Sequence, residues 1–400
     1  MAKPQAWLGV AISNTAVTLV EICHHKGHTQ LLGYAIKTLP PGEVIDNQIV
    51  DCEQIGDHIA HLVQRIGSQS KQAAIALPTS LALTKIIEMP AELTEDEIEA
   101  QIHIDADQHI PYPLSQVCLD FQIQGPADTD DSMQQVLLVP ARLEHVEQQA
   151  DSLTFAQLQP KVVDLESHAQ ICAFQLAWDN LSVHKPNNFT PNNLAHNNLA
   201  HNNLAPNHSF APANTPQTVA LIDIGESRTT FYSHQSGQLV YQSQQLFGGA
   251  QLTQAIASQQ GIDLSQAVII KHDLAAYITC QQQGSGRHKR SHKNADLTKV
   301  YTQFVADLAE HITQAFDAYA ALAPAVVTEH IMLCGGSALL PDIEAMLKDQ
   351  LSCEVSVANP FGQMKVSDQV DRDELYAEAP RLMSACGLAL RCQMQNQAYL

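Results

Sequence analysis

The sequence predicts an α/β fold built from two similar lobes that face each other across a cleft. Two strand–turn–strand units carry this prediction, one over residues 8–22 and one over residues 219–232. In each unit an apolar run leads into a short polar turn, and a second strand-like run follows. A helical pattern and a further strand come after the first unit, which is the alternation expected of an α/β chain.

The first 180 residues alternate between strand and helix patterns. Thr94 and Glu97 form a capping box that begins a helix reaching about His109. The expected elements are strands at 7–13, 17–24, 31–39, 73–77, 117–124, 135–140 and 162–165, and helices at 52–66, 94–109, 143–156 and 168–178.

The alternation resumes after residue 218. Residues 297–321 form the longest amphipathic helical pattern of the chain. The expected elements are strands at 219–222, 229–232 and 330–333, and helices at 251–257, 263–277, 297–321 and 341–350.

Two segments lack the composition of a packed core. Residues 187–207 repeat Asn-Asn-Leu-Ala with a period of five, and their polar composition predicts a flexible insertion between the two halves. Residues 281–294 contain a basic run. We expect a mobile, solvated loop there, and contact with anionic lipid or an acidic partner is the alternative.

Composition argues against several classes of protein. The formal net charge is −21 and only 5% of the residues are aromatic, which disfavours nucleic-acid binding. The nine cysteines include no C-x-x-C pair, so we expect reduced thiols in a cytoplasmic protein. The nineteen histidines show no metal-binding motif. No apolar run approaches the roughly 20 residues of a membrane span, and the N-terminus does not read as a signal peptide.

The turn of the second unit has the residue types of a phosphate site. Asp223 stands at its mouth, where a carboxylate can hold Mg²⁺ or orient a water molecule. Gly225 lets the backbone approach a ligand closely, and Glu226 and Ser227 follow at once. Backbone N–H groups in such turns can bind phosphate oxygens. An ordinary hairpin is the alternative for this turn taken alone.

The first unit contains an altered copy of this turn, formed by Ser13, Asn14 and Thr15. Ala11 stands at the position that Asp223 has in the second unit. Ser13 likewise stands at the position of Gly225, and we expect the two turns to bind the phosphates of a nucleotide from both sides of the cleft.

Two glycine pairs lie directly before predicted helices, Gly248-Gly249 and Gly335-Gly336, and Ser337 follows the second pair. Paired glycines let a flat ligand lie against the backbone. The start of a helix also favours anions, and strand–helix junctions are common ligand positions in α/β sheets. A plain turn before a helix is the alternative for each pair.

Asp164 and Glu166 place two carboxylates, two residues apart, at the end of a predicted strand. Strand alternation would put them on the same face. We expect them to hold Mg²⁺ through water or to position a hydrolytic water. A helix cap is an equal alternative for Asp164.

The order of these features resembles the ATPase superfamily of actin, Hsp70 and FtsA, with two phosphate loops, an acidic connecting segment and an adenosine loop. Within that superfamily the chain resembles the PilM family of type IV pilus assembly proteins, over nearly its whole length outside the two insertions. The Asp-Gln-x-Ile-Pro-Tyr-Pro run at 107–113 is specific because it is not a general ATPase motif. The matching runs are 84–90, 106–114, 119–126, 162–166, 245–253, 357–361 and 385–391.

The resemblance implies an actin-like bilobed fold in which a subdomain 1C replaces subdomain 1B. The implied ranges are 1–84, 160–180 and 380–400 for subdomain 1A, 85–159 for 1C, 218–260 and 328–379 for 2A, and 261–327 for 2B, with a flexible insertion at 181–217 and a mobile loop at 281–294.

The resemblance also implies a site for ATP or ADP with Mg²⁺. The implied nucleotide-binding residues are Ser13, Asn14 and Thr15 in the first phosphate loop, Asp223, Gly225, Glu226 and Ser227 in the second, Gly248 and Gly249 in the cleft, Lys271 near the adenosine, and Gly335, Gly336 and Ser337 in the adenosine loop. Asp164, Glu166 and Asp223 are the catalytic candidates, and Asp223 and Asp164 the candidate metal ligands. The family usually has Asp where this chain has Ala11, so we expect nucleotide binding with slow or negligible hydrolysis.

The partners implied by the resemblance belong to the pilus machine. A cytoplasmic location peripheral to the inner membrane is implied, with the cytoplasmic N-terminal tail of PilN docked in a groove of subdomains 1A and 1C. The pilus motor ATPases and the platform protein are further implied partners. An FtsA-like polymerising division ATPase is the alternative, and a sugar kinase is a third. Residues 393–397 do not supply the membrane-binding helix of FtsA-like chains, and no motif marks a sugar pocket.

Overall fold

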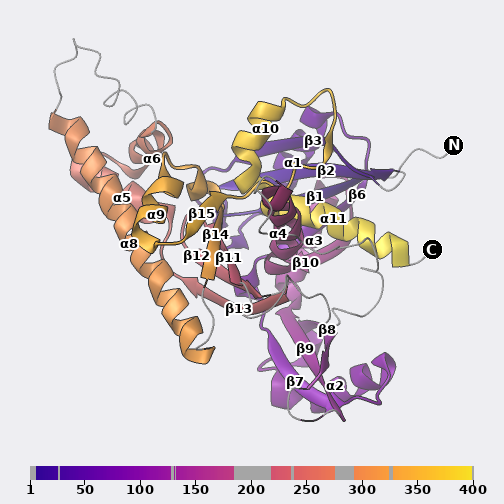
Figure 1. Cartoon of the computed structure of the whole chain (residues 1–400). Helices are drawn as coiled ribbons and strands as arrows, with labels where there is room; N and C mark the ends of the chain where they lie inside the picture. The colour runs from indigo at the N-terminus through magenta and orange to yellow at the C-terminus, as the bar shows by residue number, and fades with distance from the viewer. Residues whose placement is uncertain are drawn as a thin grey trace.

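Two sheets of matching strand order organise the chain. The computed structural model describes residues 6–25, 28–127, 130, 132–183, 218–235, 238–274, 292–323 and 328–398. The first sheet has the order β10-β6-β1-β2-β3-β16, and the second has the order β13-β12-β11-β14-β15. Read from the other end and without β16, the first order is β3-β2-β1-β6-β10, which corresponds strand for strand to the second, and Figure 1 shows the two sheets beside each other. The predicted α/β fold with two similar lobes is confirmed.

The first lobe consists of the first sheet and the two helices on its outer face. Its strands are β1 (Ala6–Ile12), β2 (Ala16–His25), β3 (His28–Thr38), β6 (Gln72–Leu77), β10 (Gln159–Leu165) and β16 (Lys365–Val366). The helices α1 (Cys52–Ile66) and α3 (Leu143–Phe155) pack on this face. Because side chains alternate along a strand, Leu8 and Val10 point to these helices, and Ala11 points to the other face.

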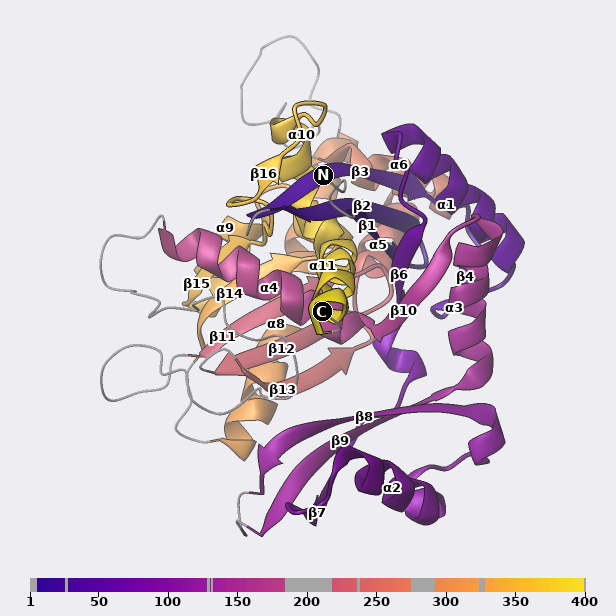
Figure 2. The same cartoon turned by 90° about the vertical axis from the view of Figure 1, so that its right-hand side faces the viewer.

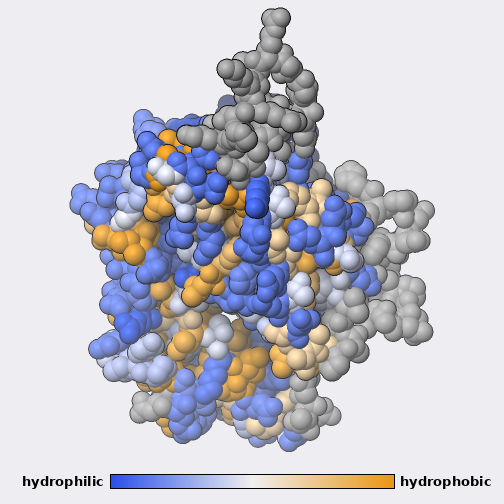
Figure 3. Space-filling model, turned by 90° about the vertical axis from the view of Figure 1, so that its left-hand side faces the viewer, coloured by the Kyte–Doolittle hydropathy of each residue, from blue (hydrophilic) through white to orange (hydrophobic). Residues whose placement is uncertain are grey.

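The second lobe repeats this plan with different helices. Its strands are β11 (Thr218–Ile224), β12 (Thr229–Gln235), β13 (Gln238–Gln245), β14 (Thr328–Cys334) and β15 (Glu354–Val357). The helices α5 (Gly249–Gln260), α6 (Leu264–His272), α8 (His292–Leu322) and α9 (Ile343–Leu351) belong to this lobe, and α5, α8 and α9 pack on its outer face with Ile222 and Leu333. Seen from the side of α5 and α8, hydrophobic residues form separate groups among hydrophilic ones (Figure 3).

Two helices lie between the sheets and join the lobes. The helices α4 (Glu166–Val183) and α11 (Met383–Ala398) share one hydrophobic core with the inner faces of both sheets. A Cβ atom at Gly9 would overlap Ala385 O, and one at Gly387 would overlap Ala169 O. Glycine at these two positions is therefore what allows α11 to lie so close to β1 and α4. The short helices α10 (Arg372–Glu378) and η4 (Ala379–Leu382) lead into α11.

A small subdomain projects below the two lobes in Figures 1 and 2. Its sheet has the order β7-β9-β8 and one helix packs against it. Its elements are β7 (Lys85–Pro90), α2 (Glu95–His109), η2 (Leu114–Gln116), β8 (Val117–Pro126) and β9 (Met133–Arg142). The predicted capping box is confirmed, because Glu97 N donates to Thr94 Oγ1 at 3.4 Å and Thr94 N donates to Glu97 Oε2 at 2.9 Å.

The structure differs from three of the expected boundaries. Helix α3 packs on α1 and the first sheet, although the range 85–159 assigned it to subdomain 1C. Strand β16 pairs with β3 of the first sheet, although the range 328–379 assigned it to subdomain 2A. Helix α8 already begins at His292, inside the loop expected at 281–294. The first two differences arise because long-range packing, which leaves no local pattern, decides where a short element docks.

Other expectations concern the ends of elements. Helix α6 ends at His272, with Asp273 as its C-cap, where the sequence predicted a helix over 263–277. The helix α11 was not expected at all. It is buried on several sides between two sheets, so it lacks the one-sided apolar pattern that reveals a surface helix. Most of the Asn-rich insertion at 181–217 and the basic loop at 281–294 lies outside the described residues.

Candidate functional site

Two turns of the same geometry lie at the ends of β1 and β11. In the first, Ser13 N donates to Ala16 O at 2.9 Å, and in the second, Gly225 N donates to Arg228 O at 3.0 Å. The register is also the same, because Ala11 pairs with Thr18 and Asp223 pairs with Thr230. The two turns are therefore equivalent positions of a duplicated strand–turn–strand unit.

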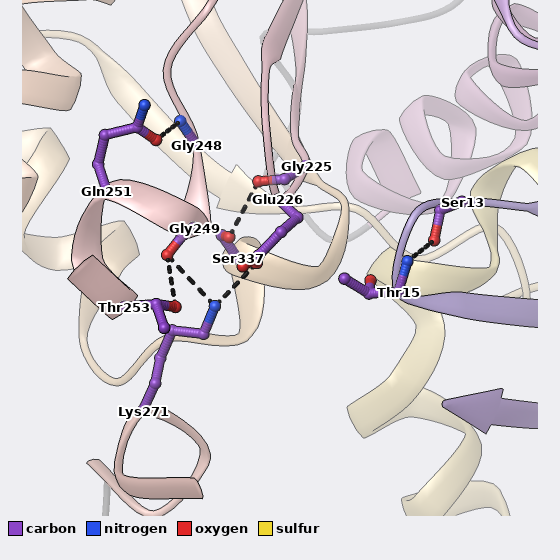
Figure 4. Close-up of polar contacts among 10 residues, drawn as sticks. All are labelled: Ser13, Thr15, Gly225, Glu226, Gly248, Gly249, Gln251, Thr253, Lys271 and Ser337. Carbon is purple, nitrogen blue, oxygen red and sulfur yellow. Dashed lines mark hydrogen bonds and ion pairs between the residues drawn. The ribbon is translucent and has the colours of Figure 1, made fainter. Parts of the chain in front are cut away.

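The first turn is held by side chains. Ser13 Oγ accepts from Ala16 N at 3.1 Å, which closes the turn on itself. Asn14 Nδ2 lies 3.5 Å from Ser227 Oγ in the second turn, so the two predicted phosphate loops meet across the cleft. Asn14 Oδ1 accepts from Asn47 N at 2.9 Å. Thr15 is exposed, and its N–H group donates to Ser13 Oγ at 3.4 Å, as Figure 4 shows.

The floor of the cleft contains two carboxylates from different lobes. Asp223 ends β11, and its Oδ2 accepts from Gln170 Nε2 of α4 at 2.6 Å. Glu166 begins α4, and Ser384 Oγ lies 3.5 Å from its Oε1. Gln170 Nε2 also lies 3.1 Å from Ser384 Oγ. Asp223 and Glu166 are thus brought together by one amide and one hydroxyl group.

Burial raises the pKa values of both carboxylates, and the charge of Arg228 opposes only part of the rise at Glu166. Burial, followed by the charge of Asp223, raises the pKa of Glu166 to about 8. Burial also raises the pKa of Asp223, and the hydrogen bond from Gln170 opposes that rise. Arg228 Nε and Gln170 Oε1 are buried without a hydrogen-bond partner in the described part of the chain. A ligand that supplies a cation and polar groups would satisfy this site.

Asp164 does not take part in this pair. Its Oδ2 accepts from Arg391 Nε at 2.6 Å, and its Oδ1 accepts from Leu165 N at 2.8 Å. His168 and Arg391 outweigh burial and lower the pKa of Asp164. Asp164 and Glu166 do not share a face, because β10 ends at Leu165 and strand alternation stops there. The expected placement of Asp164 beside Glu166 is therefore wrong, while its role as a metal ligand or catalytic group stays a prediction.

The first glycine pair packs directly on the second turn. Gly249 N donates to Gly225 O at 2.9 Å and Ala250 N donates to Glu226 O at 2.8 Å. Gly248 N donates to Gln251 Oε1 at 2.8 Å, as Figure 4 shows. These bonds occupy the first amides of α5. The predicted anion site at this helix start is therefore not formed by Gly248 and Gly249 N–H groups.

Four predicted site residues converge on the side of the cleft next to α6. Lys271 Nζ lies 2.8 Å from Glu226 Oε2 and 3.2 Å from Gly249 O. Ser337 Oγ donates to Gly225 O at 3.3 Å. A Cβ atom at Gly249 would lie only 2.7 Å from Glu226 Oε2 and from Ser337 Oγ. The absence of a side chain at Gly249 lets these polar groups pack closely, and Figure 4 shows them as one cluster.

The second glycine pair has one constrained member. Gly335 has a φ of 86°, and a Cβ atom there would overlap Asp223 Oδ1 and lie 2.7 Å from Ile224 O. Nothing lies within 4 Å of a Cβ atom at Gly336, which begins η3 (Gly336–Leu339). Gly335 therefore lets the β14 turn approach Asp223, while Gly336 is not constrained by space.

Several residues of the cleft were not expected from the sequence. Gln170 and Ser384 bind the carboxylate pair, and Asn47 binds the first turn. Gln170 is one helical turn from Glu166 on α4, so helical spacing from a known carboxylate could have revealed it. Ser384 and Asn47 gave no such signal, because they lie far along the chain from the turns that they support.

The donor set of the cleft fits a magnesium nucleotide. Mg²⁺ in proteins is commonly bound by one or two carboxylates together with phosphate oxygens and water. Asp223 and Glu166 supply such a pair, and no group of three or more His, Cys, Asp or Glu residues suited to a metal occurs in the described ranges. The two turns supply backbone and hydroxyl groups for phosphates, and Lys271 supplies a cation next to Gly249.

A second concave site lies where the small subdomain meets the first lobe. This junction pocket has a volume of about 320 Å³ and is lined by residues that include Gln48, Ser80, Leu83, Tyr112, Arg142 and His145. Arg142 Cζ lies 4.7 Å from the centre of the Tyr112 ring. Leu83 N donates to Pro140 O at 3.0 Å, which fixes the pocket wall that follows η1 (Thr79–Leu81).

Within the parts of the chain that the structure describes, no helix is long and apolar enough to cross a membrane.

Comparison with known proteins identifies the family. A solved structure named as the PilM-PilN type IV pilus biogenesis complex matches with a TM-score of 0.72 and 20% identity, covering 96% of this chain and 97% of that chain. The ethanolamine utilization protein EutJ from Carboxydothermus hydrogenoformans matches with a TM-score of 0.51 and 15% identity, over 97% of this chain and 90% of that chain. The fold is therefore actin-like. Residues 9–190 and 198–393 match the family described as type IV pilus assembly protein PilM, and the chain belongs to that family.

Proposed function

We propose that this protein is a nucleotide-binding adaptor of the type IV pilus assembly machinery. The observation that carries the proposal is the meeting of the two equivalent turns, where Asn14 reaches Ser227 above the Asp223–Glu166 pair. Two opposed turns with a carboxylate pair below them suit a chain of phosphates and its metal ion. The bound nucleotide is ATP or ADP with Mg²⁺.

The residues of the cleft divide into three roles. Ser13, Asn14, Thr15, Gly225, Glu226 and Ser227 would bind phosphates, Gly248, Gly249, Lys271 and Gly335 to Ser337 would surround the adenosine, and Asp223 with Glu166 would hold Mg²⁺. A bound Mg²⁺ would supply charge neutralisation at the phosphates. Ala11 leaves the first turn without a carboxylate, so the protein binds nucleotide and hydrolyses it slowly or not at all.

The junction pocket is the proposed docking site of a partner. PilN is a partner of the PilM relative whose complex is solved. We assign the cytoplasmic N-terminal tail of PilN to the pocket, because a narrow cavity with apolar Leu83, aromatic Tyr112 and cationic Arg142 suits a short extended peptide. In this role the protein lies on the cytoplasmic side of the inner membrane and connects PilN to the motor ATPases and the platform protein. Its activity would then serve twitching motility, adhesion and DNA uptake.

Nucleotide binding is tested on the Lys271–Glu226 ion pair. A fluorescent ADP analogue is titrated into the wild type and into Lys271→Met, and we expect the variant to lose about tenfold in affinity. Lys348→Met is the matched control, because Lys348 of α9 also forms an ion pair, in which its Nζ lies 2.9 Å from Oε2 of Glu354 on β15. Wild-type protein that binds neither ADP nor ATP with a Kd below about 1 mM contradicts the nucleotide part of the proposal.

Partner binding is tested on the rim of the junction pocket. A synthetic peptide of the PilN tail from the same organism is titrated into the wild type and into Leu83→Glu. We expect the substitution to weaken binding by about tenfold or more, because Leu83 is 42% exposed on the pocket wall. Ile104→Glu changes an exposed apolar residue of α2 outside the pocket and should bind as the wild type does. Equal loss in both variants would disprove the assignment of the pocket.

A further inference from the structure

We propose that a pocket at the base of the first sheet binds an aliphatic amino acid or a short peptide by its ammonium and carboxylate groups. The inference goes beyond the proposed function, because neither the nucleotide nor the PilN tail is assigned to this part of the molecule. This base pocket has a volume of about 610 Å³, which lies in the range of sites for small molecules. Its lining includes Glu21, Leu32, Ile66, Ser68, Lys71 and Gln159.

The base pocket lies at the opposite end of the first sheet from the nucleotide cleft. Its lining also includes the first residues of three neighbouring strands, Ala6 of β1, Gln72 of β6 and Gln159 of β10. Because β6 runs parallel to both β1 and β10, all three strands start at one edge and end at the other. The turn of Ser13 follows the last residue of β1, so about 20 Å of strand separates the two sites. A ligand of the base pocket therefore does not compete for the groups that bind the nucleotide.

The base pocket contains a buried carboxylate with an unused acceptor. Glu21 of β2 is only 6% exposed, and its Oε1 accepts from Ser68 Oγ at 2.6 Å. Among the residues that the structure describes, none donates a hydrogen bond to Glu21 Oε2, and no cationic side chain pairs with this carboxylate. Burial raises the pKa of Glu21, and only the hydrogen bond from Ser68 opposes that rise. A cation from outside the chain would offset the cost of burying this charge.

Another buried carboxylate of the same lobe is satisfied within the protein. Glu43 is 9% exposed and precedes the hairpin of β4 (Val44–Ile45) and β5 (Gln48–Ile49). Its Oε1 accepts from Gln54 Nε2 at 2.7 Å, and its Oε2 lies 3.0 Å from His58 Nε2. Both oxygens of Glu43 thus have partners, whereas Glu21 lines a pocket with one oxygen unpaired. This difference favours a ligand-binding role for Glu21 over a purely structural one.

The end of helix α1 adds negative potential to the same wall. The helix ends at Ile66, and both Ile66 and its C-cap Gly67 line the base pocket. The last carbonyl groups of a helix carry a partial negative charge, which favours a cation near them. Ser68 N donates to Val63 O at 3.2 Å, so the helix end also holds Ser68 against Glu21. The carboxylate and the helix end therefore both favour an ammonium group.

An exposed cation lines the base pocket as well. Within the described parts of the chain, Lys71 forms no ion pair with Glu21 or with another carboxylate. Its backbone is held in place, because Lys71 O accepts from Gln159 N at 2.6 Å. Opposite charges that line one cavity without pairing suit a ligand that carries both charges itself. Leu32 and Ile66 are partly buried in the same lining and suit the methylene groups between the two charged ends.

Three compounds with the same carbon chain test the ligand class on the full chain without nucleotide. ε-Aminocaproate carries both charged ends, hexylamine carries only the ammonium group, and caproate carries only the carboxylate. In saturation-transfer NMR titrations we expect ε-aminocaproate to bind with a Kd below about 1 mM and hexylamine to bind about fivefold more weakly. Caproate should not bind, because Glu21 repels it. Glycine and γ-aminobutyrate repeat the titration with shorter distances between the charges.

The titrations also separate the base pocket from the nucleotide cleft. Saturating ADP with Mg²⁺ should leave the affinity for the amino acid unchanged, and displacement by ADP overturns the assignment to the base pocket. Absence of binding by all three amino acids overturns the proposal. Equal affinities for hexylamine and the best amino acid overturn the assignment of a ligand with a carboxylate.

Glu21→Gln tests the ammonium-binding group. The amide keeps the size of the side chain and an acceptor for Ser68, but it removes the charge. We expect ε-aminocaproate and hexylamine each to lose about tenfold in affinity. Glu43→Gln is the matched control, since it changes a buried carboxylate of the same lobe outside the pocket and should keep the wild-type affinities. Equal losses in the two variants overturn the assignment of Glu21.

Lys71→Glu tests the carboxylate-binding group at an exposed position, where the substitution does not disturb the core. The variant should reverse the preference of the pocket, so that hexamethylenediamine binds about fivefold more tightly than ε-aminocaproate. Lys348→Glu, at an exposed lysine of the second lobe, should keep the wild-type preference. An unchanged preference in Lys71→Glu overturns the assignment of Lys71, and with it the zwitterionic ligand.

Discussion

The turns at Ser13–Thr15 and Gly225–Ser227 occupy the same place in two sheets of the same order, yet they differ in chemistry. The first is closed by a hydroxyl group, with Ser13 Oγ accepting from Ala16 N. The second is surrounded by close backbone contacts, in which Gly248 and Gly335 approach it where no side chain would fit. Equal backbone geometry therefore does not give equal function. The residues that surround a turn decide what it can bind.

The difference is largest at the last residue but one of each central strand, Ala11 in β1 and Asp223 in β11. Ala11 is 7% exposed and belongs to the hydrophobic core between the sheets. Asp223 has the same register and takes its hydrogen bond from Gln170 on α4. At this position the first lobe thus contributes a packed methyl group, that of Ala11, and the second lobe contributes the carboxylate of Asp223. The pair of Asp223 and Glu166 can hold the metal ion of a magnesium nucleotide, whereas phosphoryl transfer would also use a carboxylate at the position of Ala11.

The largest expected effect concerns the close approach to the second turn. Gly335→Ala places a Cβ atom into Asp223 Oδ1 at a φ of 86°, and we expect a loss of about 3 kcal/mol in the free energy of unfolding. Urea denaturation followed by circular dichroism measures it. Gly336→Ala is the stability control, since it meets no atom within 4 Å. Similar losses in the two variants would mean that the contact with Asp223 is not what constrains this turn.

The next effect is a pH dependence that arises from Glu166, the carboxylate of α4 that lies beside Asp223. The folded-state pKa of Glu166 is raised from 4.5 to about 8, so the folded protein keeps a proton that the unfolded chain loses. Stability is therefore fully present below about pH 4.5 and falls as the pH rises towards 8. We expect the nucleotide-free protein to lose about 2 kcal/mol between pH 6 and pH 8, measured by urea denaturation at both values.

Glu166→Gln identifies the source of this dependence. The amide keeps the size of the side chain and cannot ionise, so the variant should lose most of the pH dependence and be more stable than the wild type at pH 8. Glu144→Gln, at an exposed carboxylate of α3, serves as the control. A wild-type slope that persists in Glu166→Gln would assign the proton to another group.

A smaller change should follow when the first turn is made to resemble the second. Ala11→Asp restores a carboxylate at the position equivalent to Asp223, and we expect magnesium-dependent ATP turnover to rise by about tenfold over the wild type. Phosphate release from radiolabelled ATP measures the rate. Ala11→Asn is the control, because it has nearly the same volume without the charge. Equal rates in the two variants would show that the missing carboxylate does not limit hydrolysis.

Local pattern was enough to predict most of the fold. Helix α1 occurs at the predicted residues 52–66, and every strand and helix expected in the first 180 residues is present. The turns could be predicted too, because each depends on residues that are adjacent in the chain. Asn14 and Ser227, for example, were named from separate local motifs, and the structure brings them together across the cleft.

What the sequence could not predict depends on contacts between distant segments. The direction of Asp164 is set by Arg391 of α11, a helix that shows no amphipathic pattern because both sheets bury it. The amides before α5 looked available for an anion, but Gly225 O and Glu226 O accept from them. In each case a polar group was expected to serve a ligand and is instead satisfied by another part of the protein.

The smallest expected effect tests the hydroxyl group that closes the first turn. Ser13→Ala removes the acceptor of Ala16 N, and because Ser13 is exposed we expect a loss of only about 0.5 kcal/mol in the free energy of unfolding. Hydrogen exchange of the Ala16 amide should become faster, while urea denaturation reports the stability. Ser13→Thr keeps the hydroxyl and should behave as the wild type does. If Ser13→Ala leaves exchange at Ala16 unchanged, the backbone bond from Ser13 N to Ala16 O suffices to hold the turn, as the corresponding bond does at Gly225, and the two turns are more alike than their side chains indicate.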